Sequence, residues 1–172
     1  MKKVTQAFLA AIFLAVSLGA AGFAGGGGET SLSDYKQYRL DGKKFFLYLT
    51  KDNPYTAWPL WPTKGELSPP GGEAHGSYVT TYVNPKAYRA ITQKEDMAYG
   101  SLIVMESYGP DKNLTSLAAK VKLKRYNPPG GDWYWFTYAP DGTVKAEGRV
   151  VPCLDCHGKN KTNDYILTAP LK

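Results

Sequence analysis

The sequence predicts a single domain of the α+β class, built mainly from antiparallel β-strands. Runs rich in β-branched and aromatic residues fill the second half of the chain, and Gly, Pro, Asn or Asp separates them. A single short helical pattern interrupts these runs, and no internal repeat is visible. Four of the runs follow one another through short turns, which predicts an antiparallel meander accompanied by a few short helices.

The order of the elements follows from local signals. A first strand is expected at residues 77–83. Asn84 then supplies a helix N-cap, and Pro85 occupies the first helical position. Gly100 ends the connection that follows this short helix. The four meander strands are expected at residues 102–108, 114–126, 133–138 and 143–148.

The second meander strand carries an alternating charge pattern. Val121 and Leu123 alternate with three lysines at positions 120, 122 and 124. Because successive side chains of a strand point to opposite faces, the pattern predicts one face packed on the core and one exposed to solvent.

The region before the first strand is less regular. The apolar residues 45–49 fit either a strand or one turn of buried helix, and periodicity does not decide between them. Residues 53–76 are rich in Pro and Gly and carry Trp58 and Trp61. Proline disfavours regular strand pairing, so a long ordered loop around the domain is expected here.

The N-terminus has the layout of a secretory signal peptide. Lys2 and Lys3 precede an apolar run at residues 7–23, and small residues follow up to Ala24. We expect cleavage after Ala24, a flexible leader at residues 25–37, and a domain at residues 38–172. The alternative, a retained membrane anchor, fits less well because the run is punctuated by glycine and polar residues. The mature protein is therefore expected in the periplasm or otherwise exported, with no membrane association.

The charge of the chain does not indicate a nucleic-acid partner. The formal net charge is +6, and it falls to +4 once Lys2 and Lys3 are removed. The basic residues are spread along the chain instead of forming one patch, which is typical of a surface charged for solubility.

The strongest chemical signal is the segment Cys153-Leu154-Asp155-Cys156-His157, which contains the only two cysteines of the chain. Two thiols at this spacing followed by histidine are typical of c-type haem attachment, with thioether bonds from both cysteines and the imidazole on the iron. A thioredoxin-like pair would need an α/β context. A zinc site would need two more ligands, and a plain disulfide would leave His157 unexplained. One covalent haem c in a C-terminal attachment segment is predicted.

A sixth ligand on the iron would favour electron transfer over chemistry at the metal. Three residues are candidates. Met105 alternates with Ile103 on a predicted strand and is assigned to the core. Met97 lies in the loop between helix and strand. His75 lies in a loop, where it either ligates the iron or is solvated.

Glu106 is a candidate proton relay. If its strand face, shared with Leu102, Val104 and Tyr108, points inward, a carboxylate is buried there and needs a partner. If the opposite face points inward, Glu106 is exposed to solvent. The sequence leaves both registers open.

Several stretches together resemble one known family. They are the run from Gly100 to Gly109 (GSLIVMESYG), Tyr126 to Trp135 (YNPPGGDWYW), Tyr138-Ala-Pro-Asp-Gly, and the cysteine motif followed by Asn163-Asp-Tyr. In order and spacing, over residues 76–168, they are similar to the cytochrome P-460 family, which includes the cytochromes c′-beta.

This resemblance implies a mainly antiparallel β domain and a five-coordinate haem with an open distal position. Members that oxidise hydroxylamine have a lysine joined to the porphyrin and a distal carboxylate, and cytochromes c′-beta bind nitric oxide in an apolar pocket. The resemblance implies Lys94 as the cross-linking lysine, with Lys86 or a merely solvated Lys94 as the alternatives, and Glu106 as the distal carboxylate. Residues 79–81 stand where some members have a distal arginine, which argues against efficient hydroxylamine oxidation.

The sequence thus predicts an exported monohaem c-type cytochrome whose open haem site binds or oxidises small nitrogen species, nitric oxide or hydroxylamine. As an oxidoreductase it would pass electrons to a redox partner cytochrome, and a homodimer is allowed. The alternatives are a six-coordinate periplasmic electron carrier and a gas-binding haem protein without turnover.

Overall fold

The fold was analysed in a computed structural model, which describes residues 40–70 and 73–171. The predicted signal peptide and leader lie outside these residues. Among the described residues, no helix is both long enough and apolar enough to span a bilayer.

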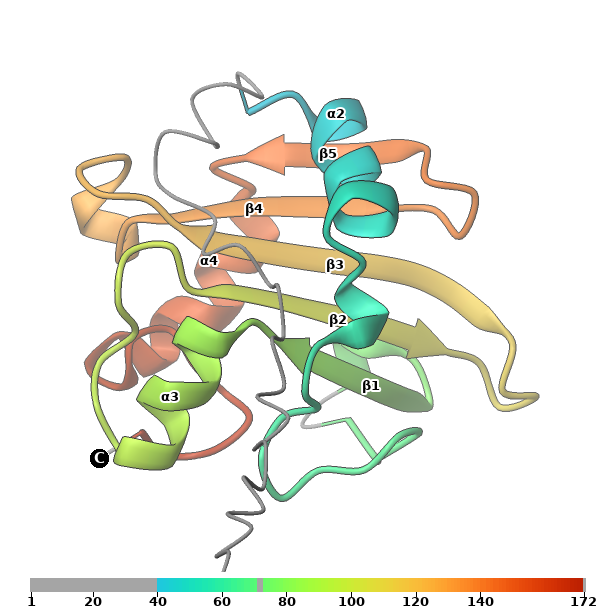
Figure 1. The fold of residues 1–172 in the computed structure, drawn as a ribbon, viewed down its shortest axis with the longest axis horizontal. Coiled ribbons are helices and arrows are strands. Elements are labelled where there is room, and N and C mark those ends of the chain that lie inside the picture. Colours follow the sequence, from blue (N-terminus) through green and yellow to red (C-terminus); the bar gives the residue numbers. More distant parts are fainter. Residues whose placement is uncertain (1–39, 71–72, 172) are drawn as a thin grey trace, which may run out of the picture.

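A five-stranded antiparallel sheet forms the centre of the domain (Figure 1). Its strands lie side by side in chain order: β1 (Tyr78–Val83), β2 (Leu102–Tyr108), β3 (Leu114–Lys122), β4 (Trp133–Tyr138) and β5 (Val144–Gly148). The predicted α+β class and meander are confirmed. β3 ends earlier than predicted, because the chain turns at Arg125, which has a φ of +63°.

Short helices connect and cover the sheet. α2 (Gly42–Leu47) begins at Asp41, whose carboxylate accepts the Lys44 N–H at 3.0 Å, and runs into a π-helical turn, η1 (Tyr48–Asp52). The ambiguous apolar run 45–49 is therefore helical. α3 (Pro85–Gln93) has the predicted Asn84 cap, which accepts the Ala87 N–H at 3.0 Å. The remaining elements are η2 (Tyr55–Ala57), η3 (Glu73–His75), η4 (Pro128–Gly130), α4 (Val151–His157) and η5 (Gly158–Asn163).

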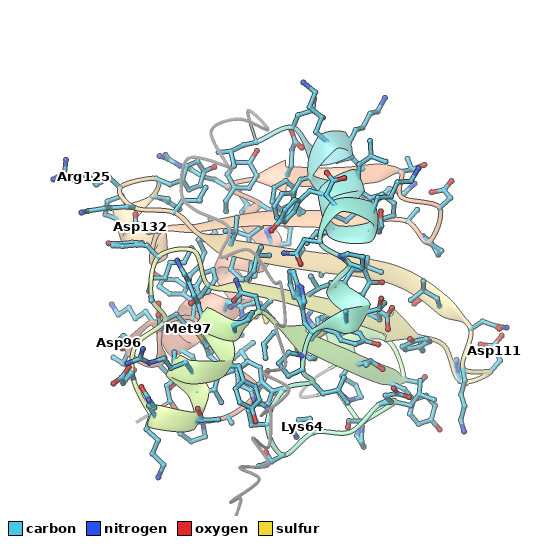
Figure 2. All side chains as sticks on the ribbon, in the orientation of Figure 1. Lys64, Asp96, Met97, Asp111, Arg125 and Asp132 are labelled. Carbon is cyan, nitrogen blue, oxygen red and sulfur yellow. The ribbon has the colours of Figure 1, made fainter. Side chains whose placement is uncertain are left out.

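Both faces of the sheet are covered, because α2 and α4 lie on opposite sides of it (Figures 1 and 2). On the α2 side, the Phe45 ring stacks on Phe136 with centroids 4.2 Å apart, inside a cluster that includes Leu49 and Val104. On the α4 side, a second cluster is built around Trp61, Trp133, Trp135, Val83 and Ile166.

The prediction of a solvent-exposed face on β3 is wrong. Lys120 is only 6 % exposed and lies on the α4 side of the sheet. Its neighbour Val121 is fully buried on the α2 side. β3 is the central strand, so the Lys120 ammonium packs against Trp133 and Trp135 of the neighbouring strand β4 and not against water.

The described part of the Pro- and Gly-rich segment is an ordered loop, as predicted. It is attached to β1 by isolated bridges, Leu60 to Tyr82 and Ser68 to Val79. Trp58 and Trp61 are buried, and Trp61 is only 1 % exposed. The loop therefore covers the free edge of the sheet at β1, and it ends in η3, directly before that strand.

Candidate functional site

A cavity of about 280 Å³ lies between the sheet and α4. Cys153, Cys156 and His157 of α4 line one side of it, and Trp61 and His75 line it from the long loop. The structure thus brings the three residues of the predicted attachment motif to one cavity.

The sheet side of the cavity carries a row of small or apolar side chains. Antiparallel register places Thr81, Met105, Ala118 and Thr137 in this row across β1 to β4, and all four line the cavity. Successive strands lie about 4.8 Å apart, so the row spans about 14 Å. A row of this width can pack against an aromatic macrocycle.

The helix α4 gives the motif its geometry. Residues three and four apart lie on the same face of a helix, so Cys153, Cys156 and His157 can all face the cavity. Pro152 stands in the first turn, where its missing N–H is of no consequence. Both thiols are free and half-buried, and burial raises the pKa of the Cys153 thiol.

His157 is oriented by a backbone carbonyl. Its Nδ1 lies 2.8 Å from the Tyr165 oxygen. Because a carbonyl oxygen only accepts, Nδ1 must carry the hydrogen, and Nε2 keeps its lone pair for a metal. Burial, with the Lys120 charge as a smaller cause, lowers the pKa of His157 to about 4, so the imidazole is neutral at pH 7.

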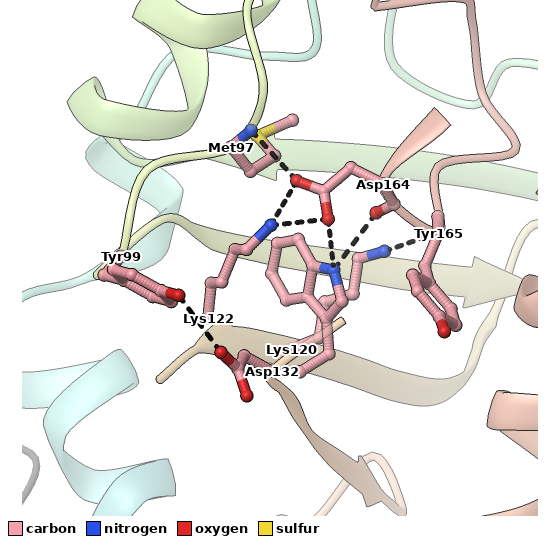
Figure 3. Close-up of polar contacts among 8 residues, drawn as sticks. Met97, Tyr99, Lys120, Lys122, Asp132, Asp164 and Tyr165 are labelled. Atoms are coloured by element: carbon pink, nitrogen blue, oxygen red, sulfur yellow. Dashed lines mark hydrogen bonds and ion pairs between the residues drawn. The ribbon is translucent and has the colours of Figure 1, made fainter. Parts of the chain in front are cut away.

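The Tyr165 carbonyl is itself held by an unusual stretch of backbone. Asp164 and Tyr165 both have positive φ values, 53° and 60°, which non-glycine residues rarely adopt. The Asp164 carboxylate anchors the turn (Figure 3): it accepts the Met97 N–H at 2.9 Å, binds Lys122 in an ion pair, and lies 3.3 Å from Trp133 Nε1. These contacts of Asp164 hold the turn that positions the Tyr165 carbonyl, and the orientation of His157 depends on that carbonyl.

Lys120 is a site residue that the sequence pattern missed. Its Nζ donates to the Tyr165 oxygen at 2.9 Å (Figure 3). This carbonyl therefore accepts from both Lys120 and His157. The ammonium lies 4.4 Å from the ring centre of Trp133 and 4.8 Å from that of Trp135. Burial lowers the pKa of Lys120 to about 7. The alternation of Lys120 with apolar residues predicted an exposed side chain. The signal for a buried position is the pair of tryptophans, Trp133 and Trp135, on the neighbouring strand.

Two buried donors at the cavity have no partner in the described part of the chain. They are the indole N–H groups of Trp61 and Trp135, whose residues are 1 % and 5 % exposed. An unpaired buried N–H costs about 1–3 kcal/mol, so these two groups lower the stability of the cavity wall.

The structure does not bring Lys94 or Glu106 to this cavity, contrary to the predicted roles. Lys94 caps the end of α3 in an αL conformation, and its side chain is exposed. Glu106 is buried, but on the α2 side of the sheet, where it accepts hydrogen bonds from Tyr55 at 2.8 Å and Tyr108 at 2.6 Å. Strand alternation is the reason, because Met105 faces the cavity and its neighbour must face away.

Of the three candidates for a sixth ligand, two line the cavity and one does not. Met97 is buried in the second cluster, in the segment between α3 and β2, and does not line the cavity (Figure 2). His75 and Met105 do line it. The assignment of Met105 to the core is therefore wrong: it is half-buried, belongs to neither buried cluster and lies in the cavity wall.

The family model of cytochrome P460 matches residues 53–168. The chain belongs to the cytochrome P460 family. Membership makes it a haem protein, and the matched range contains every cavity residue named above. No curated protein is similar enough to the chain to be matched with it.

The residues of this cytochrome P460 family member fit a haem. His157 has a lone pair available for iron, and the two cysteines stand directly before it on α4 beside the same cavity. Among the described residues, no group of three or more His, Cys, Asp or Glu side chains is arranged to hold a metal ion by itself.

Proposed function

We propose that the protein is an exported monohaem c-type cytochrome that binds small nitrogen species at the iron. The observation that carries the proposal is the position of His157. It faces the cavity directly after two free thiols, and its Nδ1 is already committed to the Tyr165 carbonyl. Nε2 would then be the atom that ligates the iron, and Cys153 and Cys156 would hold the haem c.

The attachment chemistry needs no oxidant. Each thiol adds across one vinyl group: sulfur forms a bond to the inner vinyl carbon, and the thiol hydrogen moves to the outer carbon. Because the two cysteines lie on one turn of α4, both additions take place along one edge of the porphyrin. The bound haem supplies a redox-active iron with one ligand position beyond His157.

The sheet side of the cavity favours a small neutral ligand. The row of Thr81, Met105, Ala118 and Thr137 contains no ionisable group, and Ile103 and Trp61 add apolar surface. Nitric oxide suits such a wall. Hydroxylamine oxidation would need a base near the ligand and a partner cytochrome to take the electrons. Lys94 and Glu106 do not line the cavity, whereas Lys120 and His75 do.

A second candidate function, periplasmic electron transfer, is favoured by one observation. His75 lines the same cavity as His157, and a second axial histidine is typical of electron carriers. In that case the iron is six-coordinate at rest.

Covalent attachment is tested by producing the full chain together with a cytochrome-maturation system. Wild type should keep its haem through acid–acetone extraction and on a denaturing gel, and its mature N-terminus should follow Ala24. The double variant Cys153→Ser/Cys156→Ser should lose the haem, whereas Asp155→Asn, an exposed change between the cysteines, should retain it. Haem extracted freely from wild type would refute covalent attachment. A spectrum that nitric oxide leaves unchanged in both oxidation states would refute ligand binding.

A further inference from the structure

Lys120 is a buried lysine without a carboxylate partner. The residue lies on the central strand β3 and is only 6 % exposed. The Asp164 carboxylate forms its ion pair with Lys122, and among the described residues Lys120 has no ion pair. Because lysine is almost never fully buried unless it is paired, a buried ammonium here indicates a functional role for the charge.

The Lys120 ammonium packs on two tryptophans and donates to one carbonyl oxygen. Its Nζ lies 4.4 Å from the ring centre of Trp133 and 4.8 Å from that of Trp135. It donates to the Tyr165 oxygen at 2.9 Å (Figure 3). The same oxygen accepts from Nδ1 of His157 at 2.8 Å. Lys120 and His157 therefore compete for one acceptor.

This competition changes what the imidazole can give to a metal. When Nδ1–H donates to a strong acceptor, the ring becomes more basic and its Nε2 becomes a stronger electron donor. A second donor that carries a positive charge draws the electron density of the carbonyl oxygen toward itself. The hydrogen bond from Nδ1 is then weaker, and Nε2 donates less strongly.

We propose that Lys120 is a positioning residue that acts through the Tyr165 carbonyl to weaken electron donation from His157, and so raises the reduction potential of the haem iron. This rests on the proposed haem site and adds the control of its potential. Weaker donation and an added positive charge both favour Fe(II) over Fe(III), so the two effects have the same sign.

The size of the effect follows from the shared oxygen. Because both donors contact it, Nζ lies within about 6 Å of Nδ1, where a unit charge at an effective dielectric constant of about 20 changes a charge equilibrium by more than about tenfold. The ligating nitrogen lies on the other side of the ring, so we expect the lower limit, about tenfold, at the iron.

The test compares the matured wild type with Lys120→Met, Lys120→Gln and Lys124→Met at pH 6, where the Lys120 ammonium is charged because its pKa is about 7. Methionine removes both the charge and the donor, and glutamine removes the charge but keeps an N–H donor. Lys124, an exposed lysine just beyond β3, is the matched control. The midpoint potential is measured by spectroelectrochemistry. The iron–histidine stretching frequency is measured by resonance Raman spectroscopy directly after photolysis of the carbon monoxide complex.

Lys120→Met should shift the equilibrium toward oxidised iron by at least about tenfold, which is about 59 mV toward more negative potential for a one-electron couple. Its stretching frequency should rise, because the Tyr165 carbonyl then accepts from His157 alone. Lys120→Gln should show a lower potential with a smaller rise in frequency. Lys124→Met should match wild type in both quantities.

Three results would overturn the proposal: an unchanged or higher potential in Lys120→Met, a lower potential without a change in the stretching frequency, or the same two shifts in Lys124→Met. Failure of the haem site itself gives a different result, because wild type would then carry no covalent haem. Far-UV circular dichroism checks the fold of each variant. If Lys120→Met does not fold, an unchanged potential in Lys120→Gln overturns the proposal instead.

Discussion

The contacts of the Asp164 carboxylate with Lys122, Met97 and Trp133 allow a quantitative test of what stabilises the structure beside His157. We compare Asp164→Ala with Asp164→Asn. The carboxylate is 7 % exposed and pairs with Lys122, whose side chain is 13 % exposed. Removing one partner of a buried ion pair costs about 3–5 kcal/mol. Because Lys122 retains some access to water, the lower end of that range is expected.

The two variants separate charge from hydrogen bonding. Alanine also leaves the buried Met97 N–H without its acceptor, at about 1–3 kcal/mol, and is less tolerant of the φ of 53° at this position. Asparagine keeps an acceptor oxygen and tolerates that conformation. We therefore expect losses of about 4–5 kcal/mol for Asp164→Ala and about 2–3 kcal/mol for Asp164→Asn in the free energy of unfolding.

The assay is urea unfolding of the matured protein at pH 7, followed by circular dichroism. Asp155→Asn is the matched control: it removes an exposed carboxylate of α4 and should change the free energy by less than about 0.5 kcal/mol. Lys122→Met completes a double-mutant cycle, with an expected coupling of at least about 1.5 kcal/mol to Asp164→Ala. Equal losses in the Ala and Asn variants, or a loss below about 1 kcal/mol in Asp164→Ala, would refute the reasoning.

Two further predictions concern the buried charges on either face of the sheet. The pKa of Lys120 is about 7 in the folded protein and about 10.4 in the unfolded chain. Between these two pH values the unfolded chain binds one more proton than the folded protein. The free energy of unfolding therefore rises by about 1.4 kcal/mol per pH unit in this range. Urea unfolding at pH 7, 8 and 9 should show this rise in the free energy of unfolding for wild type and not for Lys120→Met. Parallel pH profiles of the two proteins would contradict the prediction. Glu106→Gln should cost about 1–3 kcal/mol, because Tyr55 and Tyr108 lose a charged acceptor. It should leave the haem spectrum and nitric oxide affinity unchanged, and a tenfold change in affinity would show that Glu106 acts at the haem.

Local chemistry explains what could be predicted before the structure. The strands are readable because alternation and turn residues act over a few positions, and Asn84 and Pro85 specify the start of α3 by themselves. The attachment motif is equally local: its spacing determines that two thiols and an imidazole share one turn of helix, whatever lies around them.

The positions that the sequence left open or predicted wrongly depend on distant residues. Alternation predicted solvent for Lys120 and left two registers open for Glu106. β3 and β2 are interior strands covered on both faces, so alternation alone does not tell which side holds the cavity. Lys94, named from the family resemblance, ends α3 in an αL conformation with an exposed side chain.

By itself, the sequence determined the order of the strands and the chemistry of the Cys153–His157 motif, because both follow from neighbours along the chain. Only the tertiary structure decided which groups face the iron ligand. Packing of α4 on the sheet brings Lys120 and the Tyr165 carbonyl to His157, and the long loop brings His75 to the same cavity. Such contacts join residues far apart in sequence, so their geometry exists only once the whole core has assembled.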